Sequence, residues 1–594
     1  MVASGVDPQA EGMAPAATLY SWNSSGDDAE MAAAVATGKI VASNHSYSPR
    51  CGWDKVDGDW HWFGLTSVDQ NESWLFGAYN NAARNWDEIA WNAPGYLIVK
   101  SAGNTRGKVH SGPHFHNNGT SLQSDSHERN GGTDKYDCLP PLSTAKNIVT
   151  VGAVEDIPNS YEKPGDVDPY LRSSWGPTDD GRIKPDLVAN GTGVYSSKGD
   201  TDDDYVSWFG TSMSAPCITG SVALLTEQYR KTYAQEPLGS TMKGVLIHGC
   251  DEAGPDPGPD YMFGWGLANI YRSAQVIQTG CGIFEETLQE GEVKLFEFNI
   301  GSCNEFKVTL VWTDPPGEAI TDQLNVRVPR LVHDLDMRVF HKGVNHKPWK
   351  LDPANPAAAA TQGDNDRDNV EMISIAQPSP GVAVVEISHE GPLAEGSQAF
   401  SLIVSGMGTG ADGTTFILEN QAVSSSYSKT ASEWIRTRNN FLTLPNSRTS
   451  LVAREKITMK TGTHLLPGSK GIYKLRTDEC FWEPQCVLAG YYAMANKTNW
   501  PEEELEVVAK DGLVVFPNPA SGQATVEFSL QNAGVVQLDL LDNLGRRVNT
   551  LANQVTFEPG VFRLPLDVSA LPKGIYFVQW QAHGQRMTRK LVVQ

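Results

Sequence analysis

The sequence predicts an α/β domain with a parallel sheet flanked by helices, followed by all-β domains. Three observations support this prediction. Up to about residue 278, apolar β-rich runs such as YLIVKSAGN alternate with helical stretches, as they do in βαβ units. From about residue 279 the helical period is lost, and strand-length runs are separated by Pro, Gly and Asp turns, which is typical of a β-sandwich. The final stretch alternates apolar and polar residues, as strands with one buried face do.

A chain of 594 residues is too long for a single hydrophobic core. The pattern divides it into an α/β domain at 1–278, a β-sandwich at 279–408, a β-rich module at 409–505 and a small antiparallel β-sandwich at 512–594. The last of these follows the acidic linker PEEELEVVAKDG. No fixed-period repeat is visible.

Charge and hydropathy exclude several classes of partner. The 47 Lys and Arg residues against 70 Asp and Glu residues give a net charge of -23, which repels nucleic acid and anionic membranes. No apolar run approaches the roughly 18 residues of a membrane-spanning helix. The opening MVASGVDPQAEG has no basic region followed by an apolar stretch, so it does not read as a signal peptide.

The eight cysteines form no CxxC pair, which disfavours zinc ribbons and thioredoxin-like chemistry. Disulfides are the leading alternative in an oxidising compartment. Because each pair brackets a short stretch of chain, the preferred pairs are Cys480 with Cys486 and Cys281 with Cys303. Small buried hydrophobes are an equal alternative for the other four, which are Cys51, Cys138, Cys217 and Cys250.

The segment GTSMSAP at 210–216 is the most informative part of the chain. Apolar residues after it recur at near-helical spacing, at Ile218, Val222 and Leu225. This predicts a helix that begins just after Ser212, since Pro216 is tolerated only in a first turn. The N–H groups of a helix N-terminus can stabilise a developing oxyanion. A serine at a helix start is usually a cap, so position alone does not make Ser212 catalytic.

The heptapeptide closely resembles the nucleophile motif of the subtilases, in which the serine after Gly-Thr attacks the scissile carbonyl. The resemblance implies that Ser212 is the nucleophile. The strand 96–100 runs into Ser101-Ala102-Gly103-Asn104, and Asn104 matches the family asparagine whose amide donates to the oxyanion. An ordinary turn residue is the alternative for Asn104. Gly210 removes a side chain where a substrate backbone would approach.

Further subtilase landmarks occur in family order. They are SNHSY at 43–47, TAKNIVTVGAVED at 144–156, SSWGPTDDGRIKPDL at 173–187 and DYMFGWGLANIYRSA at 260–274. In subtilases, strands beside the nucleophile pair with the substrate backbone by β-augmentation. The resemblance therefore implies substrate binding by Ser46, Tyr47, Ser101, Ala102 and Gly103.

A serine nucleophile needs a general base, usually a histidine oriented by a carboxylate. Subtilases place these residues in the order Asp, His, Ser. The opening MVASGVDPQAEGMAPAATLYSW resembles the residues just after the family histidine. We therefore expect the catalytic Asp and His upstream of Met1, together with a signal peptide, and we expect the chain as given to be inactive without them.

Other histidines lie between the landmarks, at His45, His110, His114 and His116. The last three form an HxxxHxH cluster in a Gly/Asn/Ser-rich stretch. A solvated loop is the simpler interpretation, and metal binding is the alternative. None of the four occupies the family position of the base.

Residues 279–408 resemble the jelly-roll domain that follows the catalytic domain in one branch of subtilases, through KVTLVWTDPPG and LVHDLDMRV. Five acidic side chains in it are candidate ligands for a structural calcium ion. They are Asp334, Asp336, Asp364, Asp366 and Asp368. The run DNDRDNVE lacks the Gly and terminal Glu of an EF-hand, and a simple acidic turn is the alternative.

The last domain resembles the C-terminal sorting signal of the type IX secretion route of certain Gram-negative bacteria, through VVFPNPASGQATVEF, LLDNLGRRV, LPKGIYFVQ and RKLVVQ. The resemblance implies the type IX machinery as a partner and a secreted or cell-surface location. A generic β-sandwich binding module is the alternative.

Together these observations predict a secreted subtilisin-like serine endopeptidase that hydrolyses polypeptide substrates through an acyl-enzyme on Ser212. The chemistry requires no cofactor. The alternative function is a proteolytically inactive remnant, or a surface protein whose β domains bind polymer or protein.

Overall fold

The computed structural model describes residues 1–407 except 3–6, 23–25, 159, 200, 202–203, 281 and 301–302. It also describes the backbones of short strands between 416 and 506. Residues 512–593 are described except 517–519, 521, 531–532, 543–545, 558–559, 570 and 584. Within these residues no helix combines the length and apolarity needed to cross a membrane.

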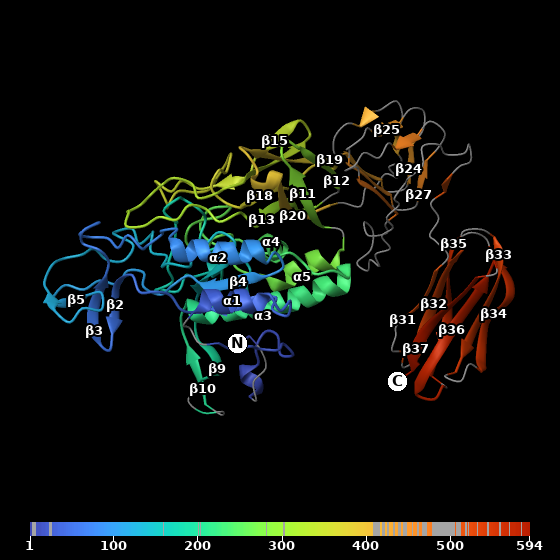
Figure 1. Ribbon diagram of the computed structural model, residues 1–594, viewed down its shortest axis with the longest axis horizontal. Coiled ribbons are helices and arrows are strands. Elements are labelled where there is room, and N and C mark those ends of the chain that lie inside the picture. The colour runs from blue at the N-terminus through green and yellow to red at the C-terminus, as the bar shows by residue number, and fades with distance from the viewer. Residues whose placement is uncertain are drawn as a thin grey trace.

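The first domain is built on a parallel sheet in the order β1-β4-β7-β8, as the sequence predicts. Its strands are β1 (Ala42–His45), β4 (Leu97–Ser101), β7 (Val149–Val154) and β8 (Leu187–Asn190). The helices around it are α1 (Asp27–Val35), α2 (Asn81–Asn92), α3 (Thr211–Tyr233), α4 (Gly239–His248) and α5 (Ile270–Gln278) (Figure 1).

Alternate residues of β4 pack against opposite layers of helices. Leu97 and Val99 share a core with α3 and α4, whereas Ile98 packs with Trp86 of α2 and Met31 of α1. The two-residue period of a strand produces this division. Both faces of the sheet are therefore covered, as is usual for parallel strands.

Helix α2 covers only the second half of the sequence run SWLFGAYNNAARNWDEIAWN at 73–92. It begins at Asn81, because the side chain of Asn80 caps it by accepting hydrogen bonds from the N–H groups of Ala82 and Ala83 at 3.1 and 3.2 Å. Asparagine is among the best N-cap residues. The preceding segment 73–80 is not helical and contains a turn in which the N–H of Phe76 donates to the carbonyl oxygen of Ser73 at 3.0 Å.

Two segments of chain, one after β1 and one after β4, together form a second, small sheet in the order β2-β3-β5-β6, which we call the insertion. Its strands are β2 (Gly52–Val56), β3 (Asp59–Phe63), β5 (His114–His116) and β6 (Leu122–Gln123). A separate hairpin pairs β9 (Val194–Ser197) with β10 (Tyr205–Trp208). In Figure 1 the sheet of the insertion lies at the end of the molecule farthest from the C-terminal domain.

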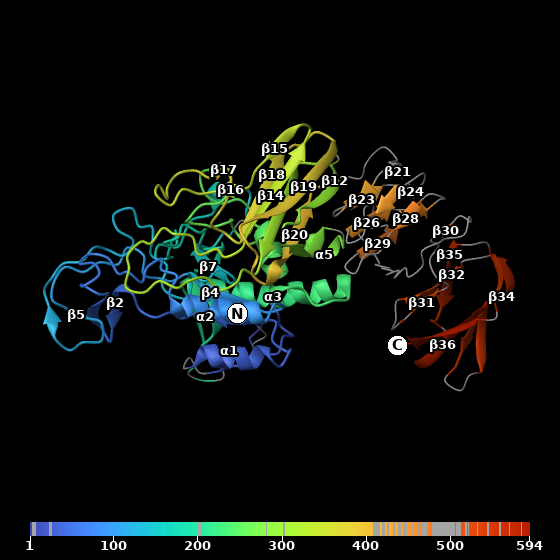
Figure 2. The same ribbon diagram turned by 45° about the horizontal axis from the view of Figure 1, so that its top comes forward.

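The second domain is a sandwich of two four-stranded sheets, β11-β20-β13-β18 and β12-β19-β14-β15. The strands are β11 (Ile283–Gln289), β12 (Lys294–Ile300), β13 (Glu305–Trp312), β14 (Asp334–His341), β15 (Val344–His346), β18 (Val370–Ala376), β19 (Gly381–Glu390) and β20 (Ser397–Ser405), with a short pair β16 (Trp349–Lys350) and β17 (Thr361–Gln362) beside them. Helix α4 packs on β13 and β20, so the sandwich lies directly against the α/β domain (Figure 2). The jelly-roll assignment itself stays a prediction.

The described strands of the third region form three parallel sheets. The sequence predicts a β-rich module here, but not this parallel arrangement. These sheets are β21-β24-β27, β22-β25-β28 and β23-β26-β29. The strands are β21 (Phe416–Leu418), β22 (Ala422–Val423), β23 (Tyr427–Ala431), β24 (Trp434–Thr437), β25 (Phe441–Thr443), β26 (Arg448–Ala453), β27 (Lys456–Met459), β28 (Thr463–Leu465) and β29 (Ile472–Thr477), and β30 (Leu505–Glu506) pairs with β27. Each sheet takes one strand from each of three successive turns of chain, which is the arrangement of a β-helix.

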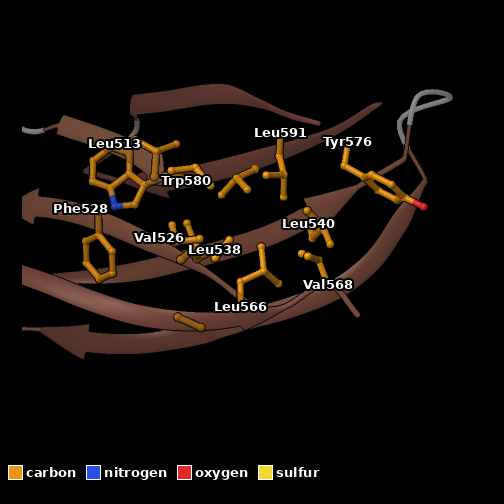
Figure 3. Packing of buried hydrophobic residues seen from close by; sticks show 14 of the residues in the cluster. Leu513, Val526, Phe528, Leu538, Leu540, Leu566, Val568, Tyr576, Trp580 and Leu591 are labelled. Atoms are coloured by element: carbon orange, nitrogen blue, oxygen red, sulfur yellow. The ribbon is translucent and has the colours of Figure 1, made fainter. Parts of the chain in front are cut away.

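The last domain is a sandwich of the sheets β31-β32-β35 and β34-β33-β36-β37, which confirms the predicted β-rich end. The strands are β31 (Gly512–Phe516), β32 (Gln523–Leu530), β33 (Gly534–Leu541), β34 (Arg547–Phe557), β35 (Gly560–Asp567), β36 (Gly574–Ala582) and β37 (Gln585–Val593). Its core contains Val526, Leu538, Leu566 and Trp580 (Figure 3). Because both sheets contribute to this core, the domain has a hydrophobic interior of its own.

Candidate active site

Ser212 lies in the first turn of α3, which begins at Thr211. The prediction that the helix starts just after Ser212, with Pro216 in its first turn, is wrong. Pro216 lies in the second turn, where it cannot donate to the carbonyl oxygen of Ser212 four residues earlier. That oxygen instead accepts a hydrogen bond from Ser46 Oγ at 3.1 Å. The proline therefore leaves a carbonyl free to connect α3 to the end of β1.

Gly210 caps α3 with a φ of 121°. A Cβ added there would lie 3.0 Å from both Nδ2 and Oδ1 of Asn104. The positive φ and the close approach each favour glycine. Gly210 thus allows Asn104 to sit beside the turn that carries Ser212; its predicted role in admitting substrate stays a prediction.

The side chain of Asn104 is held in one orientation. Its Oδ1 accepts hydrogen bonds from the backbone N–H of Thr211 at 2.9 Å and from Thr211 Oγ1 at 3.1 Å. Thr211 Oγ1 in turn accepts from the N–H of Gly103 at 3.1 Å. These donors assign the amide oxygen to the Thr211 side, and Nδ2 makes no hydrogen bond within the described residues. The amide N–H groups are therefore available beside a helix N-terminus, as an oxyanion donor must be.

Ser46 and Ser212 are joined by a reciprocal contact. Ser212 Oγ donates to the carbonyl oxygen of Ser46 at 3.2 Å, and Ser46 Oγ donates to the carbonyl oxygen of Ser212. Asn44 steadies this contact by donating to Ser46 Oγ at 3.1 Å and accepting from Thr219 of α3 at 3.2 Å. Ser46 therefore lies directly against Ser212, and its predicted role in substrate binding stays a prediction.

His45 and Tyr47, on either side of Ser46, belong to a different network. Tyr47 donates to Asp27, so its oxygen accepts from His45 Nδ1 at 2.6 Å. His45 Nε2 then accepts from Ser43 Oγ at 2.7 Å. Burial, followed by the charge of Lys100, lowers the pKa of His45 to about 4. Both side chains are engaged away from Ser212, so His45 is not its base. Substrate binding by Tyr47 stays a prediction and concerns its backbone only.

Four backbone groups of residues 101–103 are already hydrogen-bonded within the domain. The Ser101 carbonyl oxygen accepts from Ser143 and Lys100, and the N–H of Ala102 donates to Val151. The N–H of Gly103 donates to Thr211, and its carbonyl oxygen accepts from Ser174. These groups are not free to pair with a peptide strand. A role for the segment as a wall of the substrate site stays a prediction.

The five candidate calcium ligands do not form one cluster. A group that could hold a cation contains Asp336, Asp364 and Glu390, and Glu390 was not predicted. Burial raises the pKa of Asp334 to about 7, with repulsion from Asp336 adding to it. Arg338 donates to both Asp336 and Asp364, so a calcium ion would compete with this guanidinium.

The other two candidates lie outside that group. Asp366 is exposed, and its closest cation is Arg367 at 3.6 Å. Asp368 is buried and accepts from the N–H of Ile183 at 2.8 Å and from Asn365 at 3.2 Å. Asp368 therefore fastens the sandwich to the α/β domain. Calcium stays a prediction, confined to the cluster around Asp336.

The predicted disulfides lie outside the described residues, because these exclude Cys281, Cys480 and Cys486. The described cysteines carry free thiols; they are Cys51, Cys138, Cys217, Cys250 and Cys303. Cys51, Cys138 and Cys250 are buried, as expected for small hydrophobes.

Comparison with known protein families defines two parts of the chain. Residues 1–266 match the model of the subtilase family. The chain therefore contains a subtilase domain, as the motifs around Ser212 and Asn104 indicated. Residues 514–594 match the model of a secretion system C-terminal sorting domain. This domain directs export through type IX secretion to the cell surface or the extracellular space.

Several curated proteins share short stretches with the chain. A serine protease/ABC transporter B family protein of Dictyostelium discoideum is 26% identical over 207 residues, which are 29% of this chain and 11% of that protein. The C5a peptidase of Streptococcus pyogenes is 48% identical over 61 residues, which are 10% of this chain and 5% of that protein. The chain thus spans only a small part of these relatives.

Among solved structures, the patellamide maturation protease PatA is similar, with a TM-score of 0.28 and 16% identity over 42% of this chain and 67% of that one. A lanthipeptide protease gives a TM-score of 0.28 and 18% identity, covering 43% of this chain and 66% of that one.

Proposed function

We propose that the protein is a secreted serine endopeptidase that hydrolyses peptide bonds through an acyl-enzyme on Ser212. The observation that carries this proposal is the arrangement of Asn104. Thr211, the residue before the nucleophile, orients the Asn104 amide through two hydrogen bonds to its Oδ1. The Asn104 amide therefore lies beside the first turn of α3, which carries Ser212.

The proposed chemistry follows from these positions. Ser212 Oγ attacks the scissile carbonyl carbon, and its proton passes to a general base as the C–O bond forms. The negative charge on the carbonyl oxygen is met by Asn104 Nδ2 and the backbone N–H of Ser212, which has no hydrogen-bond partner among the described residues. As the intermediate collapses, the C–N bond breaks and the base returns its proton to the departing amine nitrogen. Water, deprotonated by the same base, then hydrolyses the ester in a second, equivalent step that returns the proton to Ser212 Oγ.

The base is the component that the described residues do not supply. Ser212 Oγ donates to the Ser46 carbonyl oxygen, which is far too weakly basic to accept the proton. His45 is committed to Ser43 and Tyr47. We therefore propose that the catalytic Asp and His precede Met1 in the complete protein.

Expression of the reading frame extended upstream of Met1 tests the proposal. The extended protein should hydrolyse an unstructured polypeptide such as casein, and Ser212→Ala should abolish this activity. Ser214→Ala is the matched control, because its hydroxyl lies on the same helix but donates to the Ala189 carbonyl oxygen at 3.0 Å. A fully active Ser212→Ala variant would contradict the assignment. An upstream frame without Asp and His motifs would favour the inactive alternative, in which the β domains carry the function.

A further inference from the structure

Three histidines and an aspartate of the insertion meet in one place. His114 and His116 belong to β5, and Asp125 and His127 follow β6. Residues two apart on a strand point to the same face, which places the first two rings side by side. One donor atom from each of the four residues lies within 4.8 Å of all the others. The sequence singled out His114 and His116 but not their two partners.

The spacing of the donor atoms fits a tetrahedral metal ion. His116 Nε2 lies 3.1 Å from Asp125 Oδ1 and 3.1 Å from His127 Nε2. The distances from Asp125 oxygens to the Nε2 atoms of His114 and His127 are both 3.4 Å. Zinc bonds of about 2.0–2.1 Å in tetrahedral geometry separate ligand atoms by about 3.3 Å. The observed separations lie on both sides of that value.

Two of the rings present an unprotonated nitrogen to the centre. His114 Nδ1 lies 2.8 Å from the Gly112 carbonyl oxygen, and His127 Nδ1 lies 2.5 Å from that of Gln70. A carbonyl oxygen only accepts, so each Nδ1 carries the hydrogen. The Nε2 lone pairs therefore face inward, in the arrangement by which backbone carbonyls orient metal-binding histidines.

His114 Nε2 provides a second, independent indication of a ligand. Its side chain is 0% exposed, and the atom has no hydrogen-bond partner within the described residues. Burying an unpaired acceptor costs about 1–3 kcal/mol. His116 Nε2 could donate a hydrogen bond to Asp125 or to His127, but His114 Nε2 would still lack a partner. A cation at the centre would satisfy all four groups.

Aromatic rings wall the cluster. The indole of Trp62, on β3, stacks on His127 at 3.8 Å between centroids and 7° between planes. Trp53, on β2, meets His114 edge-on at 4.7 Å. The side chains of His116 and Asp125 are 24% and 32% exposed, so an ion can enter from that side. His110 lies outside the cluster, stacked on Trp60.

We propose that His114, His116, Asp125 and His127 form a structural zinc site that holds β5 and the chain after β6 against β2 and β3. Nitrogen and carboxylate donors in a tetrahedron suit zinc better than calcium or magnesium, which prefer six or more oxygens. All four positions are filled by the protein, which leaves none open for a reacting water. The site is independent of the proposed peptidase chemistry.

Metal analysis of the full chain, prepared without a histidine tag, tests this proposal. After chelation and reloading with Zn²⁺ alone, about one zinc per chain should remain bound following desalting. His127→Gln should weaken zinc binding by at least about 100-fold in competition with a chromophoric chelator, since even changes to outer-shell partners cost 10–100-fold. His110→Gln, in the same insertion, is the matched control and should bind as the wild type does.

A second measurement separates loss of binding from loss of folding. Cobalt bound to the wild type should give the intense visible absorption of a tetrahedral centre. Asp125→Asn, a conservative change at a partly exposed position, should reduce this absorption. Absence of bound zinc in the reloaded wild type would overturn the proposal. Equal zinc affinity in His127→Gln and His110→Gln would overturn it as well.

Discussion

Replacing Lys146 with methionine is expected to destabilise the α/β domain and the sandwich together. Lys146 Nζ pairs with Asp314, and it also donates to the carbonyl oxygens of Pro315 and Arg330 at 2.7 and 2.9 Å. Both charged side chains are 0% exposed. Lys146 belongs to the α/β domain, whereas Asp314 follows β13 of the sandwich. The pair thus joins two domains through a buried contact.

The expected loss follows from the charge left behind. In Lys146→Met, Asp314 retains only the N–H groups of Val332 and His333, at 3.0 and 2.8 Å. Removing one partner of a buried ion pair costs about 3–5 kcal/mol. At roughly 2.1 cal/mol/K per residue, a cooperative unit of about 400 residues unfolds with an entropy of about 0.8 kcal/mol/K. The Tm should therefore fall by about 4–6 °C.

Differential scanning calorimetry of the whole chain measures this shift. The exposed pair Arg84–Glu88, at 3.1 Å on α2, provides the control, because Arg84→Met should cost at most about 1 kcal/mol. Adding Asp314→Asn to Lys146→Met should recover part of the loss, since no buried charge then remains unpaired. A Tm change in Lys146→Met no larger than that of Arg84→Met would refute the reasoning.

Three further changes address the oxyanion donor, a buried histidine and the carboxylate cluster. In the active, extended protein, Asn104→Ala should lower kcat by about 10²–10³-fold, which is the loss seen when an oxyanion donor of subtilisin is removed. Thr211→Val should lower kcat by about 10-fold, because the Thr211 hydroxyl helps to orient the Asn104 amide. In the Asn104→Ala background, Thr211→Val should lower kcat no further. The folded-state pKa of His45 lies below its unfolded value, so its contribution to stability is complete above about pH 6.5 and is lost as the pH falls towards 4. Between pH 7 and pH 4 the free energy of unfolding of the wild type should therefore fall by about 3 kcal/mol relative to that of His45→Gln. A Tm difference between the two proteins that does not change with pH would contradict this. Millimolar calcium should raise the Tm of the wild type but not of Asp336→Asn, and an equal rise in both would remove the calcium assignment from this cluster.

The sequence alone singles out Ser212 and Asn104 because both lie in short contiguous motifs, and their roles as nucleophile and oxyanion donor stay a prediction. Asn104 follows Gly103 just after β4, and Ser212 lies two residues after Gly210 at the start of α3. Each motif can be identified without knowing how far apart the two residues are along the chain. The start of α3 was misplaced because Pro216 was assumed to need a first-turn position. Its missing N–H is compensated by Ser46 Oγ, a contact across 166 residues that no local pattern shows.

The sequence singles out only two of the four residues that could hold a metal ion, for a similar reason. His114 and His116 form a visible HxH pair, but Asp125 and His127 join them only because the chain turns back through β6, which pairs with β5. The Asp-x-His pair at 125–127, shortly after the His-x-His pair at 114–116, is the sequence feature that indicates the other two residues. His110 belongs to the same HxxxHxH run, but it lies outside the cluster because its ring stacks on Trp60.

The parallel strands of the third region also escaped prediction. Strands of one sheet begin at Phe416, Trp434 and Lys456, and these unequal steps hide the repeat from a search for a fixed period. In a β-helix the stacking of successive turns, rather than the sequence of any one turn, buries the apolar residues. The sequence therefore predicts a β-rich module here but not its architecture.

The central claim is that Ser212 is the nucleophile of a subtilase site. Reaction of the secreted, full-length protein with a fluorophosphonate, followed by peptide mass spectrometry, tests it most directly. The account predicts one labelled residue, Ser212, with labelling lost in Ser212→Ala and kept in Ser214→Ala. Labelling at another serine, with Ser212 unmodified, would contradict it.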